Sequence, residues 1–285
     1  MPARSRLLLA ALSFSACTPA RVTVSNVSAP VEVGANENLH AVLWTQTAAE
    51  YRALTRQTYA TAERALARAL ADPSWTADTE QLAAGGYEAL PPAVVLDVDE
   101  TVLDNSAYQA RLVRTNGQYD RESWKAWVME EAATPVPGAL AFTLAAQDLG
   151  VTVVYLTNRR TDEEDATRAN LAALGFPIAA KFDGVLTRGE ADEKSDKTAR
   201  RAVVTEQFRV VAYFGDNLGD FLPDAADSVD ARNAVAAPYA DWWGERWFMF
   251  PNPQYGHWEG VVFGGDYSLS REERLRRKAD ALRVD

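Results

Sequence analysis

Two aspartates follow an apolar segment of the sequence at a spacing that suits catalysis. Residues 93–96 read Ala-Val-Val-Leu after two prolines, which is typical of a buried strand in a mostly parallel sheet. Asp97 comes next and Asp99 two residues later, where reacting groups lie in open α/β sheets, beyond the strand's carboxyl end. Two neighbouring buried carboxylates are costly unless a cation binds or one of them takes a proton. The pair therefore suits a metal-assisted nucleophile and an acid/base partner.

Two further apolar segments also end in polar side chains. Residues 151–156 lead into Thr157 and Asn158, just before a helix expected to start near residue 161, and a hydroxyl and an amide there suit an oxyanion. Residues 209–214 lead into Gly215, Asp216 and then Asp220, which completes a set of four aspartates. A turn rich in Asp and Asn is the simpler interpretation of the last segment. It does not explain why three strands each end in residues of this kind.

The rest of the chain supplies the elements that position these residues. Residues 37–71 are nearly free of Gly and Pro and carry an apolar stripe, which predicts one or two helices packed on the core. Further helices are expected over 139–149, 161–174 and 195–207, a short strand or turn over 183–187, an edge strand over 246–250, and a solvated helix over 268–284. Strands and helices in this succession predict an α/β fold.

The residues around the strand ends resemble the signatures of a known family. Residues 97–108 read Asp-Val-Asp-Glu-Thr-Val-Leu-Asp-Asn-Ser-Ala-Tyr and resemble the first signature of the class C nonspecific acid phosphatases, which are haloacid-dehalogenase-like (HAD-like) phosphohydrolases. Residues 211–221, Val-Ala-Tyr-Phe-Gly-Asp-Asn-Leu-Gly-Asp-Phe, resemble the second. The resemblance runs from about residue 39 to 260. It implies a Rossmann-like, three-layer α/β fold with a parallel sheet, and a small, mostly helical cap inserted at about 105–135.

The resemblance also implies a mechanism. Asp97 is expected to attack phosphorus and form an aspartyl-phosphate, while Asp99 protonates the leaving alkoxide and later deprotonates the attacking water. One Mg²⁺ is expected to be bound by Asp97, Asp216 and the backbone carbonyl of Asp99. Mg²⁺ usually takes only a small number of protein oxygens as ligands and keeps several waters. Asp220 is expected to hold a metal-bound water or Lys197. Because Asp99 must carry a proton to serve as the acid, the expected pH optimum is acidic.

A lysine completes the expected catalytic set. Lys197 opens a Lys-x-x-Arg-Arg run that resembles the third family motif, and this spacing favours Lys197 over Lys194. Its charge, together with Thr157 and Asn158, would offset the charge on the phosphoryl oxygens. The alternative for such a charged run is a solvated helix face.

Aromatic residues are the expected contacts for the substrate's leaving group. Tyr119 and Trp124 match family positions that bind the substrate's ring, whereas Trp127 is expected in the core of the cap. Tyr255, within Pro-Asn-Pro-Gln-Tyr-Gly, and Asn105 are further substrate-binding candidates. Aromatic planes can stack a nucleobase or an aromatic alcohol. Nucleoside monophosphates, through a 5′-nucleotidase activity, and aryl phosphates are therefore the expected substrates.

The first residues look like a targeting segment. Arg4 and Arg6 precede a short apolar run, and small residues precede Cys17, the only cysteine. Residues 1–16 are therefore expected to be a lipoprotein signal peptide, with Cys17 lipid-anchored in the membrane and residues 17–36 a tether to a domain spanning 37–285. By resemblance, Thr18 after the cysteine favours the outer membrane of the cell envelope. An ordinary secretory signal is the alternative.

Composition limits the rival functions. A net charge of −11 disfavours nucleic acid as a partner. The two histidines, His40 and His257, lie outside the motifs, which argues against a histidine-ligated zinc site. A dehalogenase would not need Asp99 as an acid, and a phosphotransferase differs only in its acceptor. A surface lipoprotein that binds nucleotide or haem is the non-enzymatic alternative, and a homodimer is suggested by analogy alone.

Overall fold

The computed structural model describes residues 36–189, 194–223 and 228–284. These residues belong to one compact unit, Val33–Asp285. The predicted signal peptide and Cys17 lie outside them, as does nearly all of the predicted tether. Within the described residues, every helix is too short or too polar to cross a bilayer.

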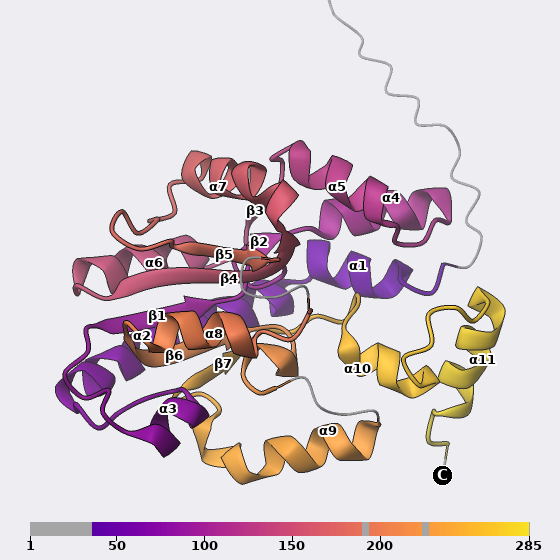
Figure 1. Cartoon of the computed structure of the whole chain (residues 1–285). Coiled ribbons are helices and arrows are strands. Elements are labelled where there is room, and N and C mark those ends of the chain that lie inside the picture. The colour runs from indigo at the N-terminus through magenta and orange to yellow at the C-terminus, as the bar shows by residue number, and fades with distance from the viewer. Residues whose placement is uncertain (1–35, 190–193, 224–227, 285) are drawn as a thin grey trace, which may run out of the picture. The chain divides into compact units, whose positions relative to one another are not determined.

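A five-stranded parallel sheet forms the centre of the fold and confirms the predicted α/β class (Figure 1). β1 (Pro92–Leu96) is its middle strand, paired on one side with β4 (Thr152–Arg160) and on the other with β6 (Arg209–Gly215). The edges are β5 (Val185–Arg188) and β7 (Trp247–Met249), in the order β5-β4-β1-β6-β7. The three strands that end in candidate catalytic residues are therefore hydrogen-bonded neighbours.

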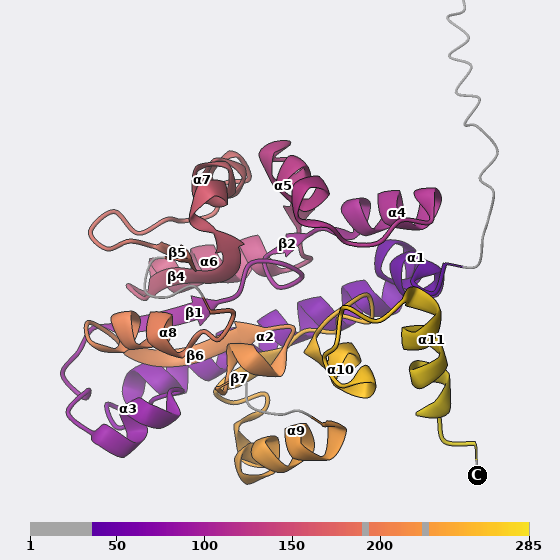
Figure 2. The ribbon, with the colours of Figure 1, turned by 45° about the vertical axis from the view of Figure 1, so that its right-hand side comes forward.

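Helices cover both faces of this sheet. α2 (Ala49–Ala71) and α6 (Ala139–Asp148) pack on one face, and α8 (Thr198–Thr205) packs on the other (Figure 2). Val94 and Leu96 of β1 point into the first core cluster, and Val95 points into the second. Because β1 is buried on both sides, its sequence is continuously apolar rather than alternating.

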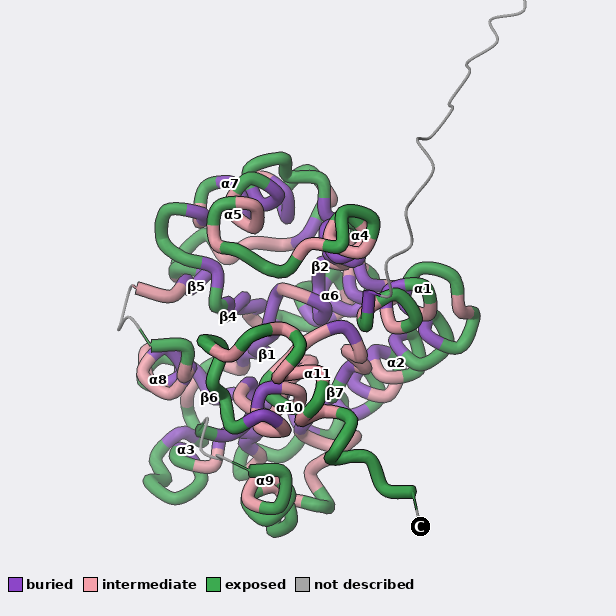
Figure 3. The backbone as a smooth tube through the Cα atoms, turned by 90° about the vertical axis from the view of Figure 1, so that its right-hand side faces the viewer, coloured by how far each residue is buried: buried purple, intermediate pink, exposed green. Residues whose placement is uncertain are grey.

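The remaining elements gather around this frame. The segment predicted as a cap contains α4 (Ser106–Thr115) and α5 (Arg121–Met129), between the short antiparallel strands β2 (Leu103–Asp104) and β3 (Thr134–Pro135). Figure 3 looks onto the carboxyl ends of the strands, and the C-terminal helices α10 and α11 lie in front of the sheet. The other helices are α1 (Leu39–Thr47), α3 (Thr79–Ala84), α7 (Glu164–Ala173), α9 (Val229–Ala236), α10 (His257–Gly260) and α11 (Arg271–Asp280), with 3₁₀ turns at Thr161–Glu163, Leu218–Asp220, Ala237–Trp242 and Val261–Phe263.

Residues 37–71, predicted as one or two helices, form two because Ala48 is extended, with a ψ of 130°. Two other predicted boundaries differ from the structure. β4 does not end at residue 156 but continues to Arg160, which pairs with Arg188 of β5. The helix expected from residue 195 begins at Thr198, where the Asp196 carboxylate accepts a hydrogen bond from the Thr198 N–H.

Candidate active site

The end of β1 places Asp97 at the centre of the site. The backbone N–H of Asp97 donates to the carbonyl of Phe214 on β6 at 2.9 Å, so the residue is still held by the sheet ladder. Its side chain is almost fully buried. The nucleophile candidate is thus fixed by the most central strand of the fold.

The end of β6 brings two more carboxylates to the same place. Asp216 follows the strand directly, and Asp220 ends the 3₁₀ turn Leu218–Asp220. The Asp220 carboxylate accepts the Asn217 N–H at 2.9 Å and lies against Gly215. A Cβ atom on Gly215 would lie only 2.2 Å from an Asp220 carboxylate oxygen, so only glycine fits there.

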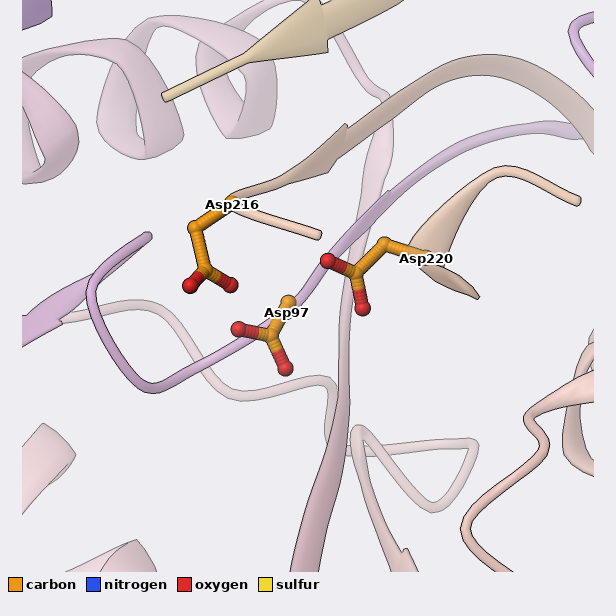
Figure 4. Close-up of side chains that lie close together, drawn as sticks. All are labelled: Asp97, Asp216 and Asp220. Atoms are coloured by element: carbon orange, nitrogen blue, oxygen red, sulfur yellow. The ribbon is translucent and has the colours of Figure 1, made fainter. Parts of the chain in front are cut away.

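Three aspartates form an acidic cluster that one lysine partly neutralises. Asp97, Asp216 and Asp220 each offer one oxygen, and these oxygens lie within 4.8 Å of one another (Figure 4). The buried Lys197 ammonium donates to Asp97 at 2.5 Å and to Asp220 at 2.7 Å. Lys197 is the residue just before α8, and the structure brings it together with the aspartates as the sequence predicts. When all four groups are ionised, one positive charge faces three negative charges.

Burial dominates the electrostatics of the cluster. It raises the pKa of Asp97 to about 7; Lys197 opposes this shift, and Asp220 and Asp99 add to it. Burial and the neighbouring Asp97 raise the pKa of Asp216 well above its usual range. Burial lowers the pKa of Lys197, but Asp220 and Asp97 outweigh it, and the net shift is upward. A group of carboxylate oxygens with excess negative charge fits a hard divalent cation.

Asp99 is held by residues of β4 and the cap. Its Oδ1 accepts hydrogen bonds from Arg159 Nη2 at 2.8 Å, Arg159 Nε at 3.0 Å and Asn105 Nδ2 at 2.9 Å. From the described residues, Oδ2 accepts only the longer Arg159 Nε contact, at 3.3 Å. Oδ2 is thus the oxygen left for proton transfer. Arg159 was not predicted from the sequence. Its position directly after Thr157 and Asn158, near the end of β4, was a signal that it lies close to the site.

Asn105 lies behind Asp99 rather than in the cavity. It is fully buried, and its Oδ1 accepts hydrogen bonds from the indole of Trp127 at 2.9 Å and from Arg159 at 3.3 Å. It does not line the cavity. A contact of Asn105 with substrate stays a prediction; in this structure its amide donates to Asp99 instead.

Replacing Arg159 by Gln is expected to lower kcat by about 10- to 1000-fold, since Asp99 loses the side chain that orients it and general acids contribute on the order of 10²–10⁴-fold. The loss should be larger for an alkyl phosphate than for 4-nitrophenyl phosphate, whose leaving group needs little protonation. Steady-state kinetics on both esters, beside the exposed neighbour variant Arg160→Gln, measures this difference. Equal losses on the two esters would assign Arg159 a purely structural role.

The end of β4 is fastened to the loop before α8 by a second buried arginine. Arg200 donates to the backbone carbonyl of Thr157 and, at 2.7 Å, to the side-chain oxygen of Asn158. It also reaches the carbonyls of residues 194–196, just ahead of Lys197. Arg200 thus sets the position of Lys197 relative to β4, a role that the sequence alone did not reveal.

Thr157 and Asn158 differ in what they can contact. Asn158 is exposed and lines the cavity, and because its oxygen accepts from Arg200, its amide nitrogen is left for a ligand. Thr157 is fully buried, its hydroxyl accepts the Arg159 N–H at 3.1 Å, and it does not line the cavity. The contact of Thr157 with phosphoryl oxygens stays a prediction, and in this structure its hydroxyl contacts the strand end instead.

One cavity of about 1270 Å³ joins these groups to the aromatic candidates. Its wall includes Asp97, Asp99, Asn158, Lys197, Asp216 and Asp220, together with Tyr119, Trp124 and Tyr255. The rings of Tyr119 and Trp124 have centroids 6.4 Å apart. The Tyr255 hydroxyl donates to the buried Glu100 carboxylate, so its ring rather than its hydroxyl is left for a ligand. Trp127 is buried in the core, as predicted.

Two residues of the C-terminal segment also reach the cavity. The side-chain amide of Gln254 is buried in its wall, and none of the described residues hydrogen-bonds it. His257 lines the cavity as well but is not part of the acidic cluster. Neither was predicted as a contact from the sequence, although Tyr255, which lies between them in the sequence, was a candidate.

Known proteins resemble this chain over most of the described residues. The sequence model of the HAD superfamily, subfamily IIIB (acid phosphatase), matches residues 5–258. The class C acid phosphatase from Bacillus anthracis is 36% identical, with a TM-score of 0.77 over 88% of this chain and 98% of that one, and its tungstate-bound structure matches equally. Acid phosphatase 1 of Solanum lycopersicum is 28% identical and a stem 31 kDa glycoprotein of Glycine max 25%, each over 56% of this chain. The chain matches only 57–58% of the length of these two relatives. The family match and the close structural likeness place the chain in subfamily IIIB of the HAD superfamily, whose members are acid phosphatases.

Proposed function

We propose that this protein is a metal-dependent acid phosphatase that hydrolyses phosphomonoesters through an aspartyl-phosphate. One observation carries the proposal: Lys197 joins Asp97 to Asp220, and Asp216 completes the cluster, at the wall of a large cavity. A nucleophile with a fixed ammonium beside it suits attack on a phosphoryl group.

The residues divide the reaction between them. An Asp97 oxygen bonds to phosphorus as the ester P–O bond breaks, and Asp99 Oδ2 gives its proton to the leaving oxygen. Asp99 then takes a proton from the water that attacks phosphorus, which releases phosphate and restores Asp97. Lys197 and the Asn158 amide offset charge on the phosphoryl oxygens. Because Asp99 must start protonated, the proposed optimum is acidic.

The acidic cluster fits a divalent cation, and we infer Mg²⁺. Asp97 and Asp216 would hold it, with Asp220 and the backbone carbonyl of Asp99 as further candidates. When bound, the cation neutralises charge on the phosphoryl oxygens and on the carboxylates. A site with only a few carboxylate oxygens favours Mg²⁺ over Ca²⁺, which takes more oxygen ligands.

The aromatic wall supports nucleoside monophosphates and aryl phosphates as substrates. Tyr119, Trp124 and Tyr255 line the same cavity as the catalytic carboxylates. Their faces can stack a base or a phenyl ring. Such stacking discriminates little between bases, because every base has a π-face. The unpartnered Gln254 amide offers a donor and an acceptor to a base edge.

The sequence also supports a location and an assembly. We infer that residues 1–16 are removed and that lipid on Cys17 anchors the protein in the cell envelope, in the outer membrane where one exists. A homodimer is proposed by analogy alone.

Phosphate release from a panel of esters tests the proposed function. The panel contains nucleoside monophosphates, nicotinamide mononucleotide, aryl phosphates and sugar phosphates, assayed at pH 5 to 8 with Mg²⁺ or with EDTA. We expect turnover only with metal, fastest at acidic pH and on esters with an aromatic leaving group. Transfer of phosphate to added alcohols separates a phosphotransferase from a hydrolase. Folded, metal-loaded protein that releases no phosphate from any ester would contradict the proposal and favour a binding lipoprotein.

A further inference from the structure

The cavity wall also has a region of apolar side chains that the proposed reaction does not use. We define this region, the apolar arm, by Leu112, Val262, Phe263, Tyr267, Leu275 and Leu282, all of which line the cavity. α4 of the cap supplies Leu112, and the C-terminal segment supplies the rest. The volume of about 1270 Å³ exceeds the roughly 300–1000 Å³ that is usual for small-molecule sites.

Exposed apolar side chains gather at this cavity. Tyr119, Trp258, Tyr267 and Leu282 are all large and exposed, and all four line its wall. Single exposed apolar residues are ordinary, but a group of them around one cavity indicates a ligand-binding surface. α11 has no buried residue at all (Figure 3), so packing against the core does not explain its apolar side chains.

Polar contacts hold α11 across the arm. Arg271 donates to the Asn116 side chain at 2.8 Å, next to the cap, and Lys278 donates to Glu37 at 2.8 Å and also to Glu259. Arg274 of α11, which also lines the cavity, donates to the side-chain oxygen of Gln118. Glu37 and Glu259 thus offset part of the positive charge of Arg271, Arg274 and Lys278. The side chains that define the arm are largely apolar and can contact an aliphatic chain.

We propose that the apolar arm binds the aliphatic chain of the leaving group, so that phosphomonoesters of long-chain alcohols are substrates. This inference rests on the proposed phosphatase function. Because Asp97 and Asp99 line the same cavity as Leu275 and Leu282, one ester can place its phosphate at the cluster and its chain in the arm. Each methylene that the arm buries should raise kcat/KM by roughly fourfold at most.

A chain-length series tests the arm. Ethyl, butyl, hexyl and octyl phosphate are assayed below micelle-forming concentrations, with wild type, Leu275→Glu and Arg276→Glu. Leu275 lines the arm, whereas Arg276 is its exposed neighbour on α11, outside the cavity wall. We expect the octyl-to-ethyl ratio of kcat/KM to be at least about tenfold in wild type, to fall several-fold in Leu275→Glu and to persist in Arg276→Glu. Circular dichroism confirms that both variants fold.

Binding of octylphosphonate, which cannot be hydrolysed, gives a readout that needs no turnover. Quenching of tryptophan fluorescence, with Trp124 and Trp258 in the cavity wall, should show tighter binding of octylphosphonate than of ethylphosphonate, with the difference lost in Leu275→Glu. A wild-type ratio near one in both assays overturns the inference while leaving the phosphatase intact. Octylphosphonate binding without turnover of any ester overturns the proposed function instead.

Discussion

Asp97→Asn is expected to lower kcat by at least about 10⁴-fold, comparable to the loss of other catalytic nucleophiles. The amide is nearly the same shape as the carboxylate and its oxygen still accepts from Lys197, but it is a poor nucleophile toward phosphorus. KM should change little by comparison, because the aromatic wall is untouched. Phosphate release from 4-nitrophenyl phosphate with Mg²⁺ measures the loss.

The same substitution should leave the metal-free protein at least as stable. One of three crowded carboxylates loses its charge, and burial already disfavours that charge. Urea unfolding in EDTA measures this. Asp104→Asn is the matched control, since Asp104 belongs to the same signature but lies outside the acidic cluster. It accepts the Ser106 N–H at 2.8 Å, a hydrogen bond that the side-chain oxygen of Asn also accepts, so little stability and little activity should be lost. Retention of more than one per cent of kcat in Asp97→Asn would remove Asp97 from the nucleophile's role.

Lys197→Met is expected to cost about 3–5 kcal/mol of stability, because it leaves buried carboxylates without their partner. Lys197 is buried and donates to both Asp97 and Asp220. The control is Lys125→Met: Lys125 pairs with the exposed Asp162, and such pairs contribute about 1 kcal/mol or less. Urea unfolding of both variants gives the comparison, and equal losses would show that Lys197 is not the counter-charge of the cluster.

The raised pKa values in the cluster also predict how the stability of the metal-free protein changes with pH. The pKa of Asp97 is raised to about 7 by burial, and burial also raises the pKa of Asp216 and Glu100. The native state therefore keeps protons that the unfolded chain releases near pH 4, so metal-free stability should fall as pH rises from about 4 to about 7. Lys197→Met should steepen the fall, and Mg²⁺ should reduce it. Stability that rises with pH over this range would contradict the electrostatic account.

The sequence predicted the catalytic residues of the site better than the residues that position them. Asp97, Asp216 and Lys197 were identifiable because apolar strands and motif spacing point to strand ends, and parallel strands bring their ends together. Arg159, near the end of β4, and Arg200, on α8, were missed because a basic residue in such a place is usually solvated, and only the fold shows that both are buried. The same limit explains Asn105 and Thr157, which are fully buried and do not line the cavity.

The C-terminal segment was the least predictable part. A terminal helix without buried residues was expected from its charged sequence, and this is what α11 shows. Its contacts with the cap depend on Asn116 and Gln118, more than 150 residues earlier in the chain. Pairings at such separation leave no periodic pattern in a single sequence.

The order of the strands separates the reaction from the choice of substrate. The catalytic carboxylates lie on or just after β1 and β6, the middle of the sheet, where each strand is paired on both sides. Much of the wall of the leaving-group cavity, including Tyr255 and Leu275, comes from the segment that follows β7, an edge strand with a single neighbour. Substitutions or insertions there disturb few backbone pairings, so the range of accepted alcohols can diverge during evolution while the phosphoryl chemistry stays the same.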